Sequence, residues 1–462
     1  MNGAAHITLV PDLMWHRGEF RTGLAVTLAG DRIAAVGPRD DAAGPRTLLP
    51  GKALLPGLVN AHSHSFQRLL RGHAQVQRGE LKRSDFFSWR ETMYRLAASL
   101  TPDDLLVVAR HAFTEMLSSG ITAVGEFHYL HHCPDGQRYA DPHETSWSLI
   151  QAAKDVGIRL CLLRASYLRA GAGKPLQPLQ RRFSDGSVEA CVTLTTDLAA
   201  RVAAASDGRV TAGIAPHSLR ALPAEAVVQL AVAAQRLDAP LHMHVAEQPA
   251  EIEEVRSEHG NTPLAVLASC GVLTPRFVAV HATHVTAAEL DAMASAGAGI
   301  CLCPATEADL GDGAFATPEA LCRGLSLSLG TDDHITMDLL RQAGDLEMRE
   351  RLRQQHRLVL PRAPHALLDA ATAGGASALR LPCGRIEPGR LADLVAVDLE
   401  HPALAGWEPS ANALTACLLY SSGSATVSDV WVAGEHLVQS RGHATADAHR
   451  FAFANLARRI WS

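Results

Sequence analysis

The chain has 462 residues, of which 47% are hydrophobic and 19% charged, and its formal net charge is -6. This is an ordinary globular composition, and a negative charge without a long basic run argues against nucleic acid as a partner. No apolar stretch reaches transmembrane length, and the N-terminus lacks a charged segment followed by an apolar core, so we expect a cytoplasmic protein without a membrane partner.

The two ends of the chain read as short strands and turns. Residues 23–37 contain a Gly-Asp turn between apolar runs, which is typical of a hairpin. Residues 385–398 read as a turn and a strand, 427–438 as a second hairpin, and 444–462 as a closing amphipathic helix. We therefore predict one small β-sandwich domain built from residues 1–52 and 382–462.

Between residues 53 and 381 apolar, strand-like runs alternate with Ala/Leu-rich segments of helical spacing. The eight runs cover residues 54–59, 121–127, 159–163, 210–215, 240–245, 277–280, 299–302 and 325–329. This alternation predicts a (β/α)8 TIM-like barrel. A doubly wound open sheet is the alternative, but no G-x-G-x-x-G follows the first run. Residues 171–184, rich in Gly, Pro, Gln and Arg, are predicted to form a long loop over the barrel mouth.

The first of these runs ends in a His-x-His motif formed by His62 and His64. Residues two apart in a strand project to the same face, so both imidazoles can reach one metal ion. Three later runs also end in polar candidates, namely His244, Glu247, His281 and Asp332. Barrel enzymes build their active sites at the C-terminal ends of the strands, which is where all six residues are expected.

Three histidines and one carboxylate form the predicted ligand set: His62, His64, His244 and Asp332. Such ligands without a thiolate suit one zinc ion per chain with an open position for water, and iron(II) is the other ion that this set accepts. His242 shares a strand face with His244 but lies farther from the strand end. Helix capping is the competing role for Asp332, but Asp333 can cap equally well.

A divalent ion held in this way lowers the pKa of its water from near 16 to about 7. Attack on a carbon–nitrogen centre then needs a proton carried to the departing nitrogen, and Glu247, beside the ligand His244, is predicted to carry it. His281 is predicted to orient the attacking water or to hold an imine of the substrate. Asp332 completes the predicted catalytic group.

Seven motifs carry a resemblance to a known family. They are His62-Ser-His-Ser-Phe-Gln-Arg68, Phe87-Ser-Trp-Arg90, Glu126-Phe-His-Tyr129, Ala215-Pro-His-Ser-Leu-Arg220, His242-Met-His-Val-Ala-Glu-Gln248, Val280-His-Ala-Thr-His284 and Cys303-Pro-Ala-Thr-Glu-Ala-Asp-Leu-Gly-Asp-Gly313. Over nearly the whole chain they resemble the formimidoylglutamate deiminase family, in the mononuclear deaminase branch of the amidohydrolase superfamily. The resemblance implies hydrolysis of N-formimidoyl-L-glutamate to N-formyl-L-glutamate and ammonia, a step of histidine degradation, by a homodimer.

The implied substrate is a dicarboxylate, so the pocket should offer cations at a distance from the metal. Arg220 follows the fourth strand and Arg90 lies in the loop after the first, and arginine binds carboxylates bidentately. Gln67, Tyr129 and His217 are predicted to bind the remaining polar groups of the substrate.

Two other functions compete with this hypothesis. A guanine deaminase or another nucleobase or nucleoside deaminase of the superfamily would need stacking contacts, which an aromatic content of 5% disfavours. A non-catalytic scaffold of the same fold is the second alternative, and the presence of every ligand and of Glu247 argues against it.

Overall fold

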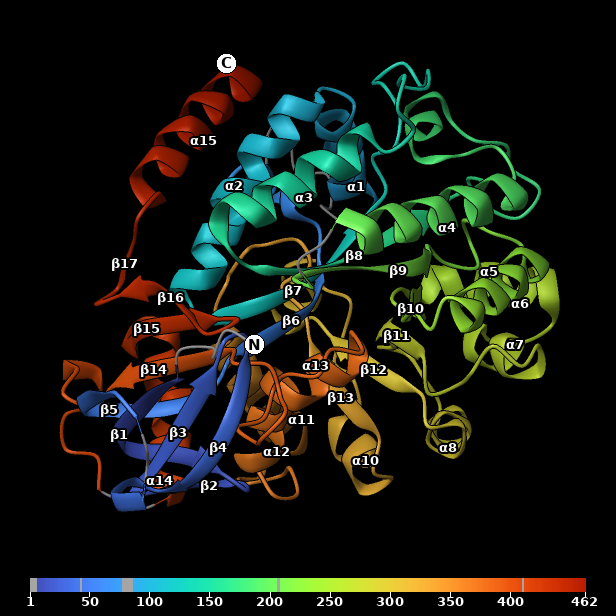
Figure 1. The fold of residues 1–462 in the computed structure, drawn as a ribbon. Helices are drawn as coiled ribbons and strands as arrows, with labels where there is room; N and C mark the ends of the chain where they lie inside the picture. Colours follow the sequence, from blue (N-terminus) through green and yellow to red (C-terminus); the bar gives the residue numbers. More distant parts are fainter. Residues whose placement is uncertain (1–5, 42–43, 77–85, 206–207, 409–410) are drawn as a thin grey trace.

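The computed structural model describes residues 6–41, 44–76, 86–205, 208–408 and 411–462 (Figure 1). Eight parallel strands form a closed barrel in the order β10-β11-β12-β13-β6-β7-β8-β9, which confirms the predicted (β/α)8 fold. The barrel strands are β6 (Leu58–Ser63), β7 (Ile121–His128), β8 (Arg159–Ser166), β9 (Val210–Pro216), β10 (Leu241–Val245), β11 (Phe277–His281), β12 (Gly299–Leu302) and β13 (Ser326–Leu329).

Barrel strands are apolar over most of their length because both of their faces are covered. Every residue of β7 and of β8 is buried, as expected for parallel strands with helices outside and side chains inside. The bounds predicted for the first strand are wrong, because residues 54–56 belong to β5 (Arg46–Pro56) of the terminal sheet. The chain passes from one sheet to the other at Gly57, where a Cβ atom would lie 2.1 Å from the hydroxyl of Thr122.

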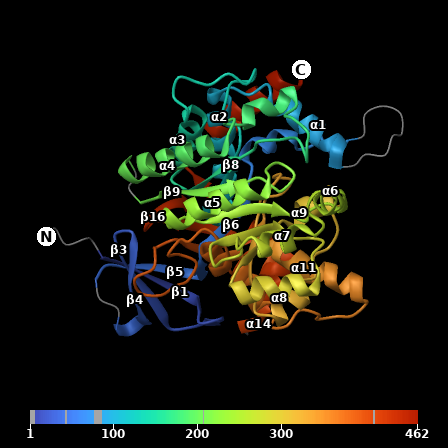
Figure 2. The same cartoon turned by 90° about the vertical axis from the view of Figure 1, so that its right-hand side faces the viewer.

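Helices surround the barrel (Figures 1 and 2). Helix α2, for example, begins with a capping box between Thr101 and Asp104, and Pro102 occupies its first turn. The helices of this region are α1 (Phe86–Ala97), α2 (Pro102–Ser118), α3 (Glu144–Val156), α4 (Val188–Ala205), α5 (Ala224–Arg236), α6 (Pro249–His259), α7 (Pro263–Ser269), α8 (Ala287–Ala296), α9 (Pro304–Asp309), α10 (Thr317–Cys322), α11 (Leu339–Gln354), α12 (His365–Asp369) and α13 (Gly375–Ala378).

Both ends of the chain form one nine-stranded sheet, in the order β17-β16-β15-β14-β5-β1-β3-β4 with β2 paired to β1. An isolated bridge pairs Arg32, at the start of the edge strand β4, with Leu391, just before the central strand β14, so the sheet folds over one shared apolar core. The predicted two-ended β domain is confirmed in this form. Besides β5, its strands are β1 (His6–His16), β2 (Glu19–Arg21), β3 (Leu24–Ala29), β4 (Arg32–Pro38), β14 (Leu394–Asp398), β15 (Val427–Val432), β16 (Glu435–Gln439) and β17 (Gly442–His443).

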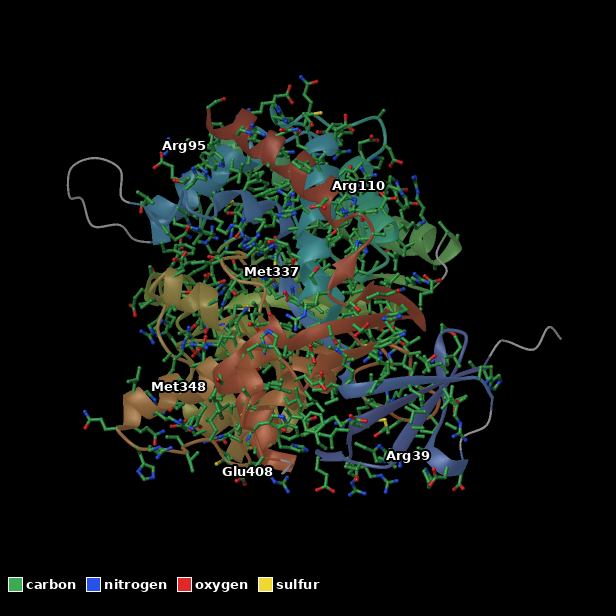
Figure 3. The ribbon with its side chains drawn as sticks, turned by 90° about the vertical axis from the view of Figure 1, so that its left-hand side faces the viewer. Arg39, Arg95, Arg110, Met337, Met348 and Glu408 are labelled. Carbon is green, nitrogen blue, oxygen red and sulfur yellow. The ribbon has the colours of Figure 1, made fainter. Side chains whose placement is uncertain are left out.

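The last helix, α15 (Ala446–Trp461), lies beside α2 of the barrel, as the view in Figure 3 shows near Arg110. Thr114 and His449 are hydrogen-bonded at 2.8 Å, and the indole of Trp461 donates to the carbonyl of Leu69. The predicted closing helix is therefore present and docks on the barrel. Within the described residues, the helices fall short of the length and apolarity needed to cross a membrane.

A buried ion pair ties the terminal sheet to the bottom of the barrel. Arg159, at the start of β8, donates two hydrogen bonds of 2.9 and 3.0 Å to Asp393, just before β14. Both side chains are at most 2% exposed. Asp393 also accepts from the backbone N–H of Ala433.

We expect Arg159→Ala to reduce the free energy of unfolding by about 3–5 kcal/mol, because it leaves the carboxylate of Asp393 buried without its cation. The measurement is denaturant-induced unfolding. Arg323→Ala, which breaks the exposed pair with Asp291, is the matched control and should cost about 1 kcal/mol or less. Equal losses in the two variants would contradict this account of the buried pair.

Candidate active site

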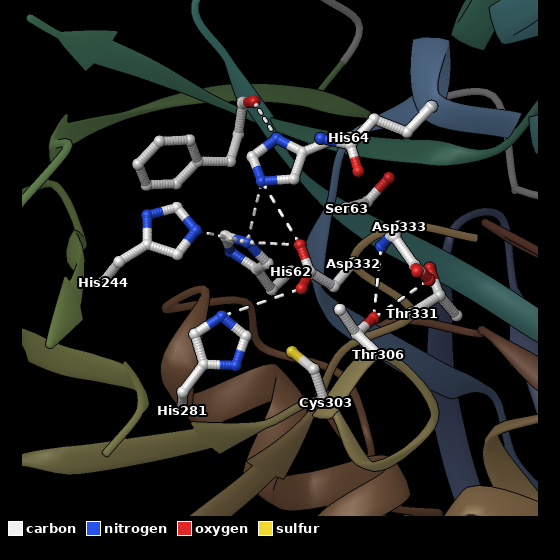
Figure 4. A network of polar contacts seen from close by, with 12 residues as sticks. His62, Ser63, His64, His244, His281, Cys303, Thr306, Thr331, Asp332 and Asp333 are labelled. Atoms are coloured by element: carbon white, nitrogen blue, oxygen red, sulfur yellow. Dashed lines mark hydrogen bonds and ion pairs between the residues drawn. The ribbon is translucent and has the colours of Figure 1, made fainter. Parts of the chain in front are cut away.

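Four side chains at the C-terminal ends of three barrel strands converge on one point: His62, His64, His244 and Asp332 (Figure 4). The Nε2 atom of His62 lies 3.2 Å from Nε2 of His64 and 3.2 Å from Nε2 of His244. Asp332 Oδ1 lies 3.3 Å from Nε2 of both His62 and His64. The structure thus brings together the four residues that the sequence analysis proposed as metal ligands.

The spacing of these atoms fits a divalent ion at their centre. Ligand atoms about 2.1 Å from one shared ion lie roughly 3.0–3.6 Å from one another, and four of them leave a fifth position for water. Burial lowers the pKa of the three imidazoles, to about 3 for His64, so each is neutral and offers a lone pair. Burial alone would raise the pKa of Asp332, but its hydrogen bond with His62 keeps it well below the usual range. The cluster therefore combines neutral nitrogen ligands with one anionic oxygen, which suits zinc or iron(II).

Backbone contacts hold two of the imidazoles in the tautomer that a metal needs. Nδ1 of His64 lies 2.8 Å from the carbonyl oxygen of Phe127, and Nδ1 of His244 lies 3.1 Å from that of His217. A carbonyl accepts only, so each Nδ1 carries the proton and each Nε2 is left for the ion.

Glu126, which the sequence analysis named only within a motif, holds in place the segment that carries the ligand His64. Its carboxylate accepts hydrogen bonds from the hydroxyl of Ser63 and from both the backbone N–H and the hydroxyl of Ser65. These contacts tie the residues on either side of His64 to the end of β7. The position of Glu126 at a predicted strand end was the available signal, but nothing in the sequence indicated its serine partners.

Glu247 and His281 lie beside the ligand cluster. Nε2 of His281 is 3.8 Å from Glu247 Oε1 and 3.6 Å from Asp332 Oδ2, and its Nδ1 is 3.5 Å from Glu307 Oε1. Burial raises the pKa of Glu247, which favours a carboxyl group that takes up and gives back a proton. Burial would lower the pKa of His281, but the negative charge of Glu247 raises it well above its usual value. The contribution of Glu307 was missed from the sequence, although it lies in the motif of residues 303–313.

The backbone at two of these strand ends is held in an unusual conformation. His281 has φ of +67° and Asp332 has φ of +45°, in the left-handed region that non-glycine residues rarely adopt. Such conformations persist where the surrounding structure enforces them, and they concentrate at functional sites. Here they turn both side chains toward the cluster.

A cavity opens over the cluster. All five residues predicted to bind substrate line it: Gln67, Arg90, Tyr129, His217 and Arg220. Arg90 was placed in a loop, and this is wrong, because it lies on helix α1 within the β6–β7 connection. Its guanidinium lies over the ring of Tyr94, and that of Arg220 lies over Tyr167. Aromatic faces thus hold both cations at the cavity wall.

Sequence reasoning missed the two tyrosines that position these arginines. Tyr167 accepts a 2.9 Å hydrogen bond from Arg220, and both Tyr94 and Tyr167 accept from Gln180. Gln180 belongs to η3 (Pro178–Phe183), a short 3-10 helix inside the loop predicted to cover the mouth. The place of Tyr167 directly after β8 was a usable signal, since residues after barrel strands line the site.

His242 and Asp333, which lie near the cluster, make other contacts. His242 hydrogen-bonds to the carbonyl of Ala378 in α13, away from the cluster, consistent with the choice of His244. The capping role given to Asp333 is wrong. Asp338 caps α11, and Asp333 instead accepts hydrogen bonds from Ile335 N–H and Thr306 Oγ1.

The sequence of this chain is similar to a known protein family and to characterised enzymes. Residues 53–437 match the model of the Amidohydrolase family. The chain is 40% identical over 430 residues to formimidoylglutamate deiminase of Pseudomonas aeruginosa, covering 92% of each chain. It is 31% identical to 5-methylthioadenosine/S-adenosylhomocysteine deaminase of Natronomonas pharaonis, over 90% of this chain and 88% of the relative.

Solved structures agree with the fold. An amidohydrolase from Brucella melitensis superposes with a TM-score of 0.89 and 31% identity, covering 99% of this chain and all of the other. An adenosine deaminase from Xanthomonas campestris, solved with bound zinc, superposes with a TM-score of 0.83 at 24% identity, covering 99% of this chain and 98% of the other.

Proposed function

Because the chain belongs to the amidohydrolase family, we propose that it hydrolyses N-formimidoyl-L-glutamate to N-formyl-L-glutamate and ammonia. The observation that carries this proposal is the polarity of the cavity. The cavity is lined both by the cationic side chains of Arg90 and Arg220 and by the carboxyl side chains of Glu247 and Asp332. A molecule that carries two carboxylates and a hydrolysable amidine matches both pairs of side chains.

Each residue at the cluster has a separate role in the proposed reaction. His62, His64, His244 and Asp332 would hold one divalent ion, which when bound lowers the pKa of water to about 7. Glu247 takes a proton from the attacking water and donates it to the nitrogen that leaves as ammonia. His281 and Asp332 Oδ2 hold the water beside the formimidoyl carbon, and addition of its oxygen gives a tetrahedral adduct. The carbon–nitrogen bond then breaks as the formyl carbonyl forms, and the second proton of the water passes from the adduct's hydroxyl to Asp332 Oδ2 and on to the departing ammonia.

The remaining polar residues orient the glutamate portion. Arg90 and Arg220 bind its two carboxylates, because a guanidinium offers two parallel donors to a carboxylate. Gln67 and Tyr129, joined by a 3.1 Å hydrogen bond, and His217 bind the polar groups between the two ends. This assignment keeps the reacting carbon over Asp332 and His281.

Zinc is the proposed ion, one per chain, and iron(II) suits the same ligands. Metal analysis of purified protein, followed by chelation and reconstitution with each ion, distinguishes the two. The homodimer implied by the family resemblance stays a prediction that light scattering can test.

Ammonia release from N-formimidoyl-L-glutamate by metal-quantified protein tests the proposed function directly. Guanine and 5-methylthioadenosine serve as controls for the nucleobase and nucleoside alternatives. Release from the glutamate derivative alone supports the proposal. Turnover of either ring compound, or no turnover at full metal occupancy, would overturn it.

Arg220→Met is expected to raise KM for N-formimidoyl-L-glutamate by about 10-fold or more, because a charge-assisted hydrogen-bond pair to a carboxylate is lost. The KM for a neutral formimidoyl compound should change little, since it has no carboxylate to bind. The measurement is steady-state kinetics on both substrates, and parallel increases would count against a carboxylate-binding role.

A further inference from the structure

One buried carboxyl group beside the cavity floor has no role in the mechanism above. Asp312 lies in the turn Gly311-Asp312-Gly313 after α9 and is 3% exposed. Its carboxylate lies within 4.8 Å of a carboxylate oxygen of Glu247 and a ring nitrogen of His281, both of which line the cavity. Asp312 therefore lies next to two residues that border the place where the formimidoyl group would react.

Asp312 is fixed at three points, which leaves one oxygen available. Its backbone N–H donates to the carbonyl of Glu307 at 2.9 Å, and its own carbonyl accepts from Nε2 of His284 at 2.8 Å. Gln248, next to Glu247, donates to Oδ1 of its side chain. The other oxygen, Oδ2, is buried and has no hydrogen-bond partner among the described residues.

A buried acceptor without a donor is costly, so native structures usually satisfy it or use it for a ligand. Burial, followed by the charge of Glu247, raises the pKa of Asp312 to about 9. The environment thus disfavours an isolated anion at this point. A ligand that brings a positive charge and an N–H donor would satisfy both the oxygen and the charge.

We propose that Asp312 is a specificity-determining residue that binds the cationic nitrogen of the substrate's head group. The inference rests on the proposed function, since a formimidoyl group is an amidine, a strong base that is protonated near neutral pH. Its terminal N–H groups can donate to Oδ2 of Asp312 while the carbon faces Asp332 and His281. The N-formyl product has a neutral carbonyl oxygen at the same place, which cannot donate. Asp312 therefore favours substrate over product and amidines over amides.

Two ligands with the same glutamate portion test this assignment. N-carbamimidoyl-L-glutamate carries a cationic guanidinium head, and N-formyl-L-glutamate carries a neutral one. Their inhibition or dissociation constants are measured for metal-loaded wild-type protein and for Asp312→Asn, which keeps the shape of the side chain. We expect the variant to bind the cationic ligand about 10–100-fold more weakly and the neutral ligand less than about 3-fold more weakly.

Asp309→Asn is the matched control, because Asp309 lies at the end of α9 and accepts from Gln75 on the surface. It should leave both constants unchanged. Equal weakening of the two ligands by Asp312→Asn would show a merely structural role, and unchanged binding of both would also overturn the proposal. Gln248→Leu keeps the carboxyl group of Asp312 but removes the hydrogen bond to its Oδ1. It should shift the ratio of the two ligands' constants in the same direction as Asp312→Asn, by a smaller factor. Absence of ammonia release by the wild-type protein would show that the proposed function is wrong. The ratio of the two constants is measured without turnover, so it tests the role of Asp312 independently.

Discussion

Replacing Asp332 by asparagine is expected to reduce turnover by about 10⁴-fold or more, the upper end of what one positioned acid–base group contributes. The substitution removes the anionic ligand from a set of three neutral imidazoles and also removes the charge that Oδ2 presents to His281 at 3.6 Å. His281→Ala should have a comparable effect, because it removes the other group that holds the attacking water. The measurements are kcat, metal content and the unfolding curve of each variant.

Asp333→Asn is the matched control for Asp332→Asn. Burial, followed by the charge of Asp332, raises the pKa of Asp333 to about 8. An asparagine oxygen can accept the same hydrogen bonds from Thr306 and Ile335. We expect this variant to stay within about 10-fold of wild type. Full activity of Asp332→Asn at normal metal content would refute the mechanism.

Glu247→Gln is expected to retain its metal and to lose about 10²–10⁴-fold in turnover, because a glutamine can neither take up nor release the proton that the leaving nitrogen needs. Glu247 is absent from the four-residue ligand cluster, so metal content should match that of wild type. Substrate binding should also persist, since the two arginines are untouched. The measurements are metal content, ligand affinity and kcat on the same preparation.

Glu254→Gln supplies the control for this substitution. Glu254 lies on α6, seven residues after Glu247, pairs with Lys174 at 3.1 Å, and is not one of the four ligands. It should keep near wild-type kcat. If Glu247→Gln lost its metal as well as its activity, Glu247 would have to be reassigned from proton transfer to a ligand or a structural support.

Much of the fold followed from the sequence because its signals are local. A barrel strand is covered on both faces, so it appears as an uninterrupted apolar run, and eight such runs alternating with helices leave few other architectures. The exception was the first run, where residues 54–59 join the end of β5 to the start of β6. Two consecutive apolar strands look like one when only their composition is read, and the change of sheet at Gly57, which packs closely against Thr122, is a tertiary feature.

The sequence by itself also determined which residues meet at the cluster. Parallel barrel strands bring their C-terminal ends to one face, so His62, His64, His244 and Asp332 could be grouped although they are far apart in the chain. The contacts that support the cluster and the cavity could not be predicted in this way. Glu126 with its two serines, Tyr167 with Arg220, and the free oxygen of Asp312 depend on which loops pack against each other. Loop packing is set by side-chain contacts between distant segments, which leave no periodic pattern in the chain, and only the tertiary structure decided them.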